Sequence, residues 1–200
     1  MRTAKIEVYR FNELNEPAKG RAREWYRTNC LDYDWWDCVY GDAKTIAGKM
    51  GIDIDNIYFS GFWSQGDGAS FTGSYRYAKG ALKSVKEYAP EDEELHRIAG
   101  GLQSIQKRYF YSLRASITNG AGSNYCSHSG TMHIEAWDAR RSGYADVGNA
   151  EGELADLMRS FADWIYQQLR EEYEFLVSNE QVDEAICANE YEFTEDGSIY

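Results

Sequence analysis

The sequence predicts an α+β fold in which helices pack on one face of an antiparallel β-sheet. Two alternating segments flank Gly66-Asp67-Gly68, and Asp-Gly between such segments is a strong hairpin signal because both residues tolerate positive φ. A second alternating pair encloses a glycine-rich loop at 119–124. Apolar residues at helical spacing fill the segments around these pairs, most clearly from residue 149 onward. We therefore expect a central hairpin over 57–77, a second strand pair, and covering helices.

The composition is typical of one soluble domain. The 200 residues include two prolines and no low-complexity tract, so we expect a single domain over 1–200, with two small lobes as the alternative that this length allows. No apolar run approaches the ~20 residues of a membrane span, and the first residues lack an apolar signal region. Four dispersed cysteines without a Cys-x-x-Cys pair are typical of reduced thiols. These features predict a cytoplasmic protein.

The first 80 residues carry alternating and helical patterns. In order, they predict a strand at 3–11, a helix starting near 15, a helix at 32–50 ended by Gly51, a turn at 53–56, and the hairpin. Asn15 is the expected helix cap, and Pro17 is harmless in the first turn. Lys19, Arg23 and Arg27 form a basic stripe on that helix. Such a stripe is either a phosphate site or, more simply, an exposed face.

The remainder of the chain predicts more helices and strands. In order, these are helices at 79–88 and 91–108, strands at 109–118 and 131–138, a helix from 149 to 176, a short helix after Ser178, and a strand at 191–194. Gly100-Gly101 is expected to kink or break the second of these helices. Ser178 and Gln181 have the spacing of a capping box. We expect the first and last strands to join the main sheet.

The net charge of −12 lies entirely in the last quarter of the chain. Residues 1–150 hold 19 basic and 19 acidic residues, whereas 151–200 hold 14 acidic residues and two arginines. This defines an acidic helical C-terminal part at about 149–200. A surface of one sign attracts basic partners and repels nucleic acid. The simpler alternative is a solvated helix face kept soluble by its charge.

Few residues point to chemistry. Cys126, His128 and His133 are close enough in sequence to begin a zinc site, with Cys187 or an acid completing it. A hydrolytic site would gather Asp67, His128, His133, Glu135 and Asp138, with His133 and Glu135 on one strand face. No nucleophile motif accompanies them, and turn geometry explains the glycines at 66–68. We assign no catalytic residue, no metal ligand and no cofactor.

Nucleic-acid binding would use exposed aromatic residues beside a short basic series. That series consists of Arg76, Lys79, Lys83 and Lys86. The overall negative charge opposes this interpretation, and the lysines fit the polar face of a helix. We therefore expect no direct contact with nucleic acid and no contact with a membrane.

Two segments resemble a group of uncharacterised phage and prophage proteins, some labelled antitoxin-like. They are Tyr-Phe-Ser-Gly-Phe-Trp-Ser-Gln-Gly-Asp-Gly-Ala-Ser-Phe at 58–71 and Ala-Asn-Glu-Tyr-Glu-Phe-Thr-Glu-Asp-Gly at 188–197. They cover about an eighth of the chain, and no established chemistry is attached to them. The resemblance implies a phage or mobile-element protein that acts in the cytoplasm of a bacterial host.

The first functional hypothesis is an acidic, protein-binding inhibitor of a host nucleic-acid-binding defence system, of anti-CRISPR or anti-restriction type. Its expected binding residues are acids of the last helices: Glu171, Glu172, Glu174, Glu180, Asp183 and Glu184. A second hypothesis is a small metal-dependent hydrolase that uses the 66–68 loop and the 126–138 segment. A third is a phage structural or housekeeping component whose aromatic surface forms an oligomer.

Overall fold

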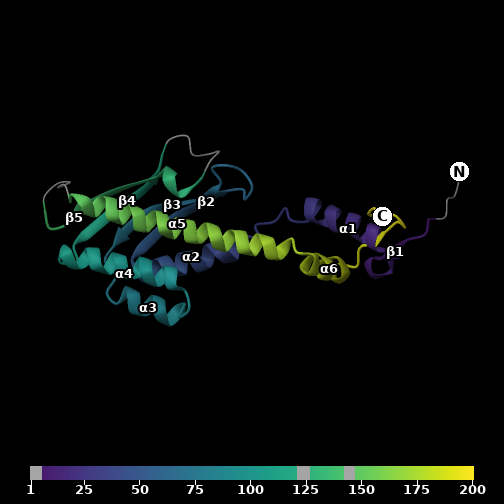
Figure 1. Ribbon diagram of the computed structural model, residues 1–200, viewed down its shortest axis with the longest axis horizontal. Helices are drawn as coiled ribbons and strands as arrows, with labels where there is room; N and C mark the ends of the chain where they lie inside the picture. Colours follow the sequence, from purple (N-terminus) through teal and green to yellow (C-terminus); the bar gives the residue numbers. More distant parts are fainter. Residues whose placement is uncertain (1–5, 121–126, 142–146) are drawn as a thin grey trace. The chain divides into compact units, whose positions relative to one another are not determined.

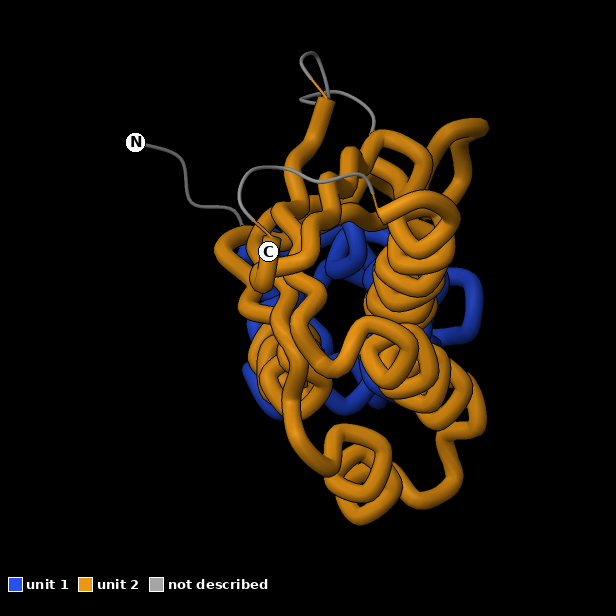
Figure 2. Tube along the Cα trace, turned by 90° about the vertical axis from the view of Figure 1, so that its left-hand side faces the viewer, with its two compact units in different colours: residues 1–37, 171–200 blue, residues 38–170 orange. Residues whose placement is uncertain are grey.

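The computed structural model describes residues 6–120, 127–141 and 147–200, and it confirms the α+β fold. The chain forms two compact units (Figure 2). Unit 1 comprises residues 1–37 and 171–200, and unit 2 comprises residues 38–170. The helix α5 (Asn149–Leu176) begins in unit 2 and ends in unit 1. None of the helices in the described ranges is long and apolar enough to cross a membrane.

Unit 2 contains a four-stranded antiparallel sheet with helices on one face (Figure 1). The strands follow one another in the order β2 (Ile52–Ser60), β3 (Gly68–Arg76), β4 (Leu113–Asn119) and β5 (Met132–Asp138). The accompanying helices are α2 (Asp37–Met50), α3 (Ala81–Tyr88), α4 (Glu93–Arg108) and most of α5, with a short 3₁₀ turn η2 (Ser129–Thr131) before β5. Along β4, Leu113, Ala115 and Ile117 are buried while Arg114 and Thr118 are exposed. This alternation leaves the other face of β4 open to solvent.

The central hairpin is confirmed, but its first strand begins earlier than predicted. Residues 53–56 belong to β2 instead of a turn, because Ile54 is buried between two exposed aspartates in the pattern of a half-buried strand. A bulge between Ile54 and Asn56 keeps the pairing with β3 in register. Opposite it, Gly73 has φ +156°, and a Cβ there would lie 2.0 Å from the Asp53 carbonyl oxygen. Only glycine fits this close approach.

The hairpin turn is also longer than the Asp-Gly signal indicated. Residues 61–67 form the loop between the two strands. The Asp67 carboxylate accepts hydrogen bonds from the backbone N–H groups of Trp63, at 2.8 Å, and Ser64, at 2.6 Å. Asp67 therefore holds the loop in shape, in the way that aspartate side chains commonly close turns.

The structure differs from the sequence prediction in two further elements, α4 and the strand after it. The predicted break at Gly100-Gly101 is absent: α4 continues through both glycines, and a Cβ at Gly101 would lie 2.8 Å from a methyl carbon of Leu157 on α5. Gly101 thus permits close contact between the two helices. The strand predicted from 109 begins only at Leu113, because residues 109–112 form a turn. Buried Gln106 holds this turn by accepting from the backbone N–H of Leu113 and donating to its carbonyl.

Unit 1 joins the two ends of the chain. It contains α1 (Glu16–Asn29), the last turns of α5, α6 (Asn179–Ala188) and a 3₁₀ turn η1 (Phe11–Glu13). The strands β1 (Tyr9–Arg10) and β6 (Glu192–Phe193) pair with each other in a separate two-stranded sheet. The expectation that they join the main sheet was therefore wrong, since the described part of the first strand is only two residues long and pairs within unit 1.

The helix caps at Asn15 and Ser178 were predicted correctly, but the capping box at Ser178 is only half formed, because the Gln181 side chain donates to Glu184. The Asn15 side chain accepts from the backbone N–H of Ala18 at 3.0 Å, and Pro17 occupies the first turn of α1. The Ser178 hydroxyl accepts from the backbone N–H of Gln181 at the start of α6. Between these helices lies a small apolar core: Phe11, Leu14, Ala18, Ala22, Val182, Ile186 and Phe193, with the rings of Tyr9, Trp25, Tyr26 and Tyr191 packed against it. Local capping signals thus fixed both helix starts.

Candidate protein-binding surface

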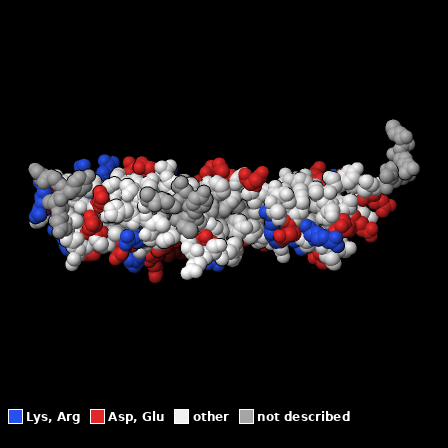
Figure 3. Space-filling model, turned by 90° about the horizontal axis from the view of Figure 1, so that it is seen from above, with Lys and Arg blue, Asp and Glu red and all other residues white. Residues whose placement is uncertain are grey.

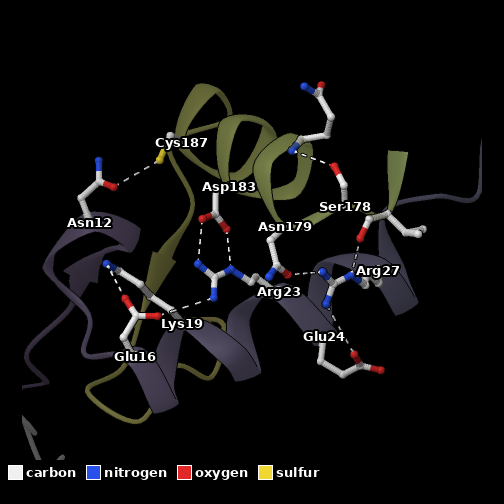
Figure 4. Close-up of polar contacts among 12 residues, drawn as sticks. Asn12, Glu16, Lys19, Arg23, Glu24, Arg27, Ser178, Asn179, Asp183 and Cys187 are labelled. Atoms are coloured by element: carbon white, nitrogen blue, oxygen red, sulfur yellow. Dashed lines mark hydrogen bonds and ion pairs between the residues drawn. The ribbon is translucent and has the colours of Figure 1, made fainter. Parts of the chain in front are cut away.

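The basic stripe of α1 faces α6 (Figure 4). Arg23 donates two hydrogen bonds to the Asp183 carboxylate, at 2.6 and 2.7 Å, and its side chain is only 16% exposed. This bidentate contact raises the pKa of Arg23 above its already high ordinary value, because the carboxylate stabilises the charged guanidinium. Arg23 and Asp183 therefore join the two helices as an ion pair.

The other two members of the stripe are also engaged inside unit 1. Arg27 donates to the Val177 carbonyl oxygen at 2.8 Å and to the Asn179 side chain at 2.7 Å (Figure 4). Lys19 lies 3.4 Å from the Glu16 carboxylate. The stripe is thus neither the phosphate site nor the solvated face that the sequence suggested. It is a polar contact between segments far apart in the chain.

The charge of the protein is divided unequally between the two units. Unit 1 holds 17 acidic and seven basic residues, a net charge of −10, whereas unit 2 holds 16 acidic and 14 basic residues, a net charge of −2. The described cations of unit 1 are bound to its own acids: besides the α1 stripe, Arg10 pairs with Glu190 and Glu192, and Arg21 with Asp196. The imbalance predicted for the last quarter of the chain is therefore a property of unit 1.

The six predicted binding acids all belong to unit 1, but they have different surroundings. Glu171, Glu172 and Glu174 lie on the last turns of α5, and Glu180 and Glu184 lie on α6. Of these five, all but half-buried Glu172 are exposed. The Asp183 carboxylate is occupied by Arg23, in a contact between α1 and α6. We assign Asp183 to the internal contact and keep the other five in the candidate surface.

The structure adds an acidic and aromatic segment that sequence reasoning missed. Residues 31–37 read Leu-Asp-Tyr-Asp-Trp-Trp-Asp, and the ring of buried Trp35 lies 5.6 Å from that of Tyr173 on α5. Trp35 therefore anchors the segment beside the predicted acids of α5. We use the name acidic surface for the acids of this segment together with those of α5 and α6: Asp32, Asp34, Asp37, Glu171, Glu172, Glu174, Glu180 and Glu184. The alternation of aspartate with aromatic residues was the signal that could have revealed it.

Large aromatic side chains are exposed within the acidic surface. Tyr33 is 50% exposed between Asp32 and Asp34, and Phe175 is 53% exposed next to Glu174. Exposed aromatic residues among charges are typical of protein interfaces, where they supply buried contact area while the charges select the partner. The geometry of unit 1 therefore suits recognition of a protein.

The residues of the hydrolytic hypothesis have separate structural tasks. Asp67 closes the hairpin loop, and His128 Nδ1 accepts from the backbone N–H of Gly130 at 3.0 Å. His133 Nε2 lies 3.3 Å from Glu135 on the exposed face of β5, as their spacing predicted. Asp138 is buried and accepts from Arg140 and Ser112, and these hydrogen bonds hold its pKa well below the usual range. The structure does not gather these five residues into one site.

The zinc hypothesis gains no support from the described residues. Cys126 lies outside them, and within the described ranges no three His, Cys, Asp or Glu side chains come together as metal ligands would.

The basic series that was considered for nucleic-acid binding does not form one surface element. Arg76 ends β3, while Lys83 on α3 pairs with Glu87 at 3.7 Å. Lys83 and Lys86 therefore lie on the exposed surface of α3, as the simpler interpretation had it, whereas Lys79 precedes the helix.

Comparison with known proteins gives a family without an assigned activity. No curated protein and no solved structure gave a significant match to the chain. A family model described as "Domain of unknown function (DUF8835)" matches residues 35–179, which is more than half of the chain. The matched range contains unit 2 and the α5 end of the acidic surface, whereas α1 lies outside it. The chain belongs to this DUF8835 family.

Proposed function

We propose that the protein acts by binding another protein through the acidic surface of unit 1. The observation that carries the proposal is the net charge of −10 in a unit whose described cations are already bound to its own acids. Unit 1 therefore carries an excess of negative charge over its own cations. Such a field attracts a basic partner and accelerates its association.

The proposed partner is a host protein whose basic surface ordinarily binds nucleic acid. Rows of carboxylates mimic the charge of a phosphate backbone, so they suit a groove lined by lysine and arginine. Tyr33 and Phe175 would add the aromatic contacts on which the affinity of protein interfaces usually depends. This combination favours a protein partner over a small cation, which would need no aromatic neighbours.

The biological setting that we propose follows from the phage-protein resemblance of the 58–71 and 188–197 segments. In that setting the chain is a phage or mobile-element inhibitor of a bacterial defence system, of anti-CRISPR or anti-restriction type. By occupying the nucleic-acid groove of the host protein, it would block that protein without any catalysis.

The test is affinity capture of the tagged chain from bacterial lysate at low and moderate salt, with identification by mass spectrometry. The test variant is E171K/E172K/E174K, and the matched control E87K/E91K/D163K reverses three exposed acids of unit 2. Circular dichroism and thermal melting establish that both variants fold. Moderate salt should weaken binding, since it screens exposed charges.

We expect a stoichiometric partner that binds the wild type and the control but not the test variant. A nucleic-acid ligand of that partner should displace the chain, because both would occupy the same groove. Equal capture by the two variants would refute the proposed surface, and a complex that nucleic acid does not displace would refute the proposed partner class.

A further inference from the structure

A second charged region lies at one end of the unit 2 sheet, where β3 ends, β4 begins and β5 ends. It contains four arginines and four aromatic residues: Arg76, Arg114, Arg140, Arg141, Tyr77, Phe110, Tyr111 and Trp137. We call this region the basic-aromatic end. Figure 3 shows Lys and Arg side chains at the left-hand end of the molecule, the end at which β5 is labelled in Figure 1.

Two of the arginines form a like-charge pair across strands. Arg76 on β3 and Arg114 on β4 are directly opposite each other, and Trp137 on β5 is opposite Arg114 in the same row. Both arginines are exposed, and neither forms an ion pair among the residues that the structure describes. Like charges in this position destabilise a sheet. The pair does not serve the fold, but an anion bound between the guanidinium groups would relieve the repulsion.

The adjoining turn holds two bulky aromatic residues in an unfavourable conformation. Phe110 has φ +51° and Tyr111 has φ +65°, in the left-handed region that favours glycine. Their side chains are 75% and 47% exposed, so they do not fill the core in return. Strain of this kind is retained where the residue is needed for function. Glycine or asparagine would form the same turn with less strain.

Neighbouring side chains fix the exposed rings in place. Arg140 donates to the buried Asp138 carboxylate at 3.0 and 2.7 Å, and its guanidinium lies 4.9 Å from the centre of the Phe110 ring. The Tyr111 and Tyr77 rings lie 4.5 Å apart. Asp138 offsets one of the four positive charges, and Arg141 lies 4.0 Å from the same carboxylate. The end therefore presents ordered aromatic rings beside a net positive charge.

A hollow adjoins these residues. Arg76 and Tyr77 line it together with Asp53 and the backbone around Gly51, and its volume is ≈ 500 Å³. This volume is within the range of ligand pockets. The hollow therefore has room for a group held between the Arg76 guanidinium and the Tyr77 ring.

We propose that the basic-aromatic end binds single-stranded nucleic acid, with bases stacked on the exposed rings and phosphates bound by the arginines. Unstacked bases offer π-faces to aromatic side chains, whereas the bases of a duplex do not. The sequence predicted no direct contact with nucleic acid because of the charge of −12. However, −10 of that charge lies in unit 1, and unit 2 by itself is nearly balanced at −2. The local charge of this end is positive.

The test measures fluorescence anisotropy of labelled single-stranded dT20 and rU20 with the full chain, at several salt concentrations. Phe110→Gly removes one ring and relieves the strained conformation. We expect binding to weaken by about fivefold or more, the lower range for loss of one base–ring stack, while the melting temperature stays equal or rises. A ring with a merely structural role would give the opposite pattern.

A second variant tests the phosphate contact. Arg114→Ser should weaken binding and reduce the slope of log K against log salt concentration by about one. The control Lys86→Ser removes an exposed lysine on α3 and should change the affinity less. E171K/E172K/E174K should bind the oligonucleotides as the wild type does, which separates this inference from the proposed function of unit 1.

Three results would overturn the inference. They are absence of oligonucleotide binding at low salt, unchanged binding by Phe110→Gly and Arg114→Ser, and equal binding of a duplex of the same length. Competition by poly-glutamate as strong as that by unlabelled oligonucleotide would also overturn it, because the end would then be a docking site for an acidic protein.

Discussion

The two units bury their interiors in different ways. Unit 2 stacks helices on a four-stranded sheet, and its strands β4 and β5 alternate regularly between buried and more exposed residues. Unit 1 has a small apolar cluster, and it adds edge-to-face ring contacts such as Trp25 with Tyr191, at 5.0 Å, and the Arg23–Asp183 ion pair. The comparison indicates that unit 1 depends on individual contacts, whereas unit 2 depends on a broad core.

The units also differ in charge and in their relation to the family. Unit 1 carries most of the negative charge and the acidic surface, while unit 2 has nearly balanced charge and a basic-aromatic end. The family match covers all of unit 2 but leaves out α1 and all but the first residue of α6. The acidic surface is therefore divided by the limits of the family match, which contains its acids at 37 and 171–174 but not those at 32, 34, 180 and 184.

The largest expected effect is the unfolding of unit 1 when the ring of Phe193 is removed from its core. Phe193 is fully buried, with its ring 6.4 Å from Phe11 and 6.0 Å from Trp25. Phe193→Ala should cost about 3–5 kcal/mol, enough to unfold a unit with a small core. Hydrogen exchange should show lost protection in α1 and α6 and unchanged protection in β3 and β4. Simultaneous loss in both units would contradict the independence of the two cores.

A smaller loss of stability is expected when the turn that precedes β4 in unit 2 loses the hydrogen bonds of Gln106. Gln106→Leu would leave the backbone N–H and carbonyl of Leu113 without their buried partners. An unpaired buried polar group costs about 1–3 kcal/mol, so chemical denaturation should show a loss in this range. Gln103→Leu, an exposed glutamine on the same helix, is the control. Equal stability of the two variants would mean that Gln106 does not hold the turn.

The ion pair between α1 and α6 should contribute less. Asp183→Ala removes two hydrogen bonds to the guanidinium of Arg23, but the pair is partly exposed, and ion pairs near the surface contribute about 1 kcal/mol or less. Glu184→Ala, next to it and exposed, should change the free energy of unfolding by less than about 0.5 kcal/mol. If Asp183→Ala also weakened partner capture without destabilising unit 1, our removal of Asp183 from the acidic surface would be wrong.

The smallest expected effect is the pH dependence of stability that Asp138 contributes. Hydrogen bonds from Arg140 and Ser112 hold the pKa of Asp138 below its usual range, so its stabilisation is present above the unfolded pKa of about 4 and is lost as the pH falls below it. Asp138→Asn should therefore lower the melting temperature at neutral pH, and the difference from the wild type should narrow below about pH 5. A difference that is the same at acidic and neutral pH would exclude this role.

Local signals made much of the fold predictable from the sequence. The spacing of Leu154, Leu157 and Phe161 predicted α5, and Asn15 and Ser178 marked helix starts because capping depends on neighbouring residues. The division into two units was not predictable in this way. Arg23 and Asp183 are 160 residues apart, and no local pattern indicates that they meet.

The candidate sites, too, could be predicted from the sequence only where the signal was local. The acids of α5 and α6 could be recognised in the sequence as a charge excess. That residues 31–37 lie beside α5 could not, because this depends on the contact between Trp35 and Tyr173. The 53–56 segment resembled a turn because its aspartates are typical of turns, although Ile54 is buried in a strand. The positive φ of Phe110 and Tyr111 contradicts residue preference, so only the structure could reveal it.

The most direct test of the account is hydrogen exchange of the chain alone and in complex with its captured partner. We predict protection at residues 31–37 and 171–184, which carry the acidic surface, and unchanged exchange on the open face of β4 and β5. Protection confined to the unit 2 sheet, with residues 31–37 and 171–184 unaffected, would contradict the claim that unit 1 binds the partner.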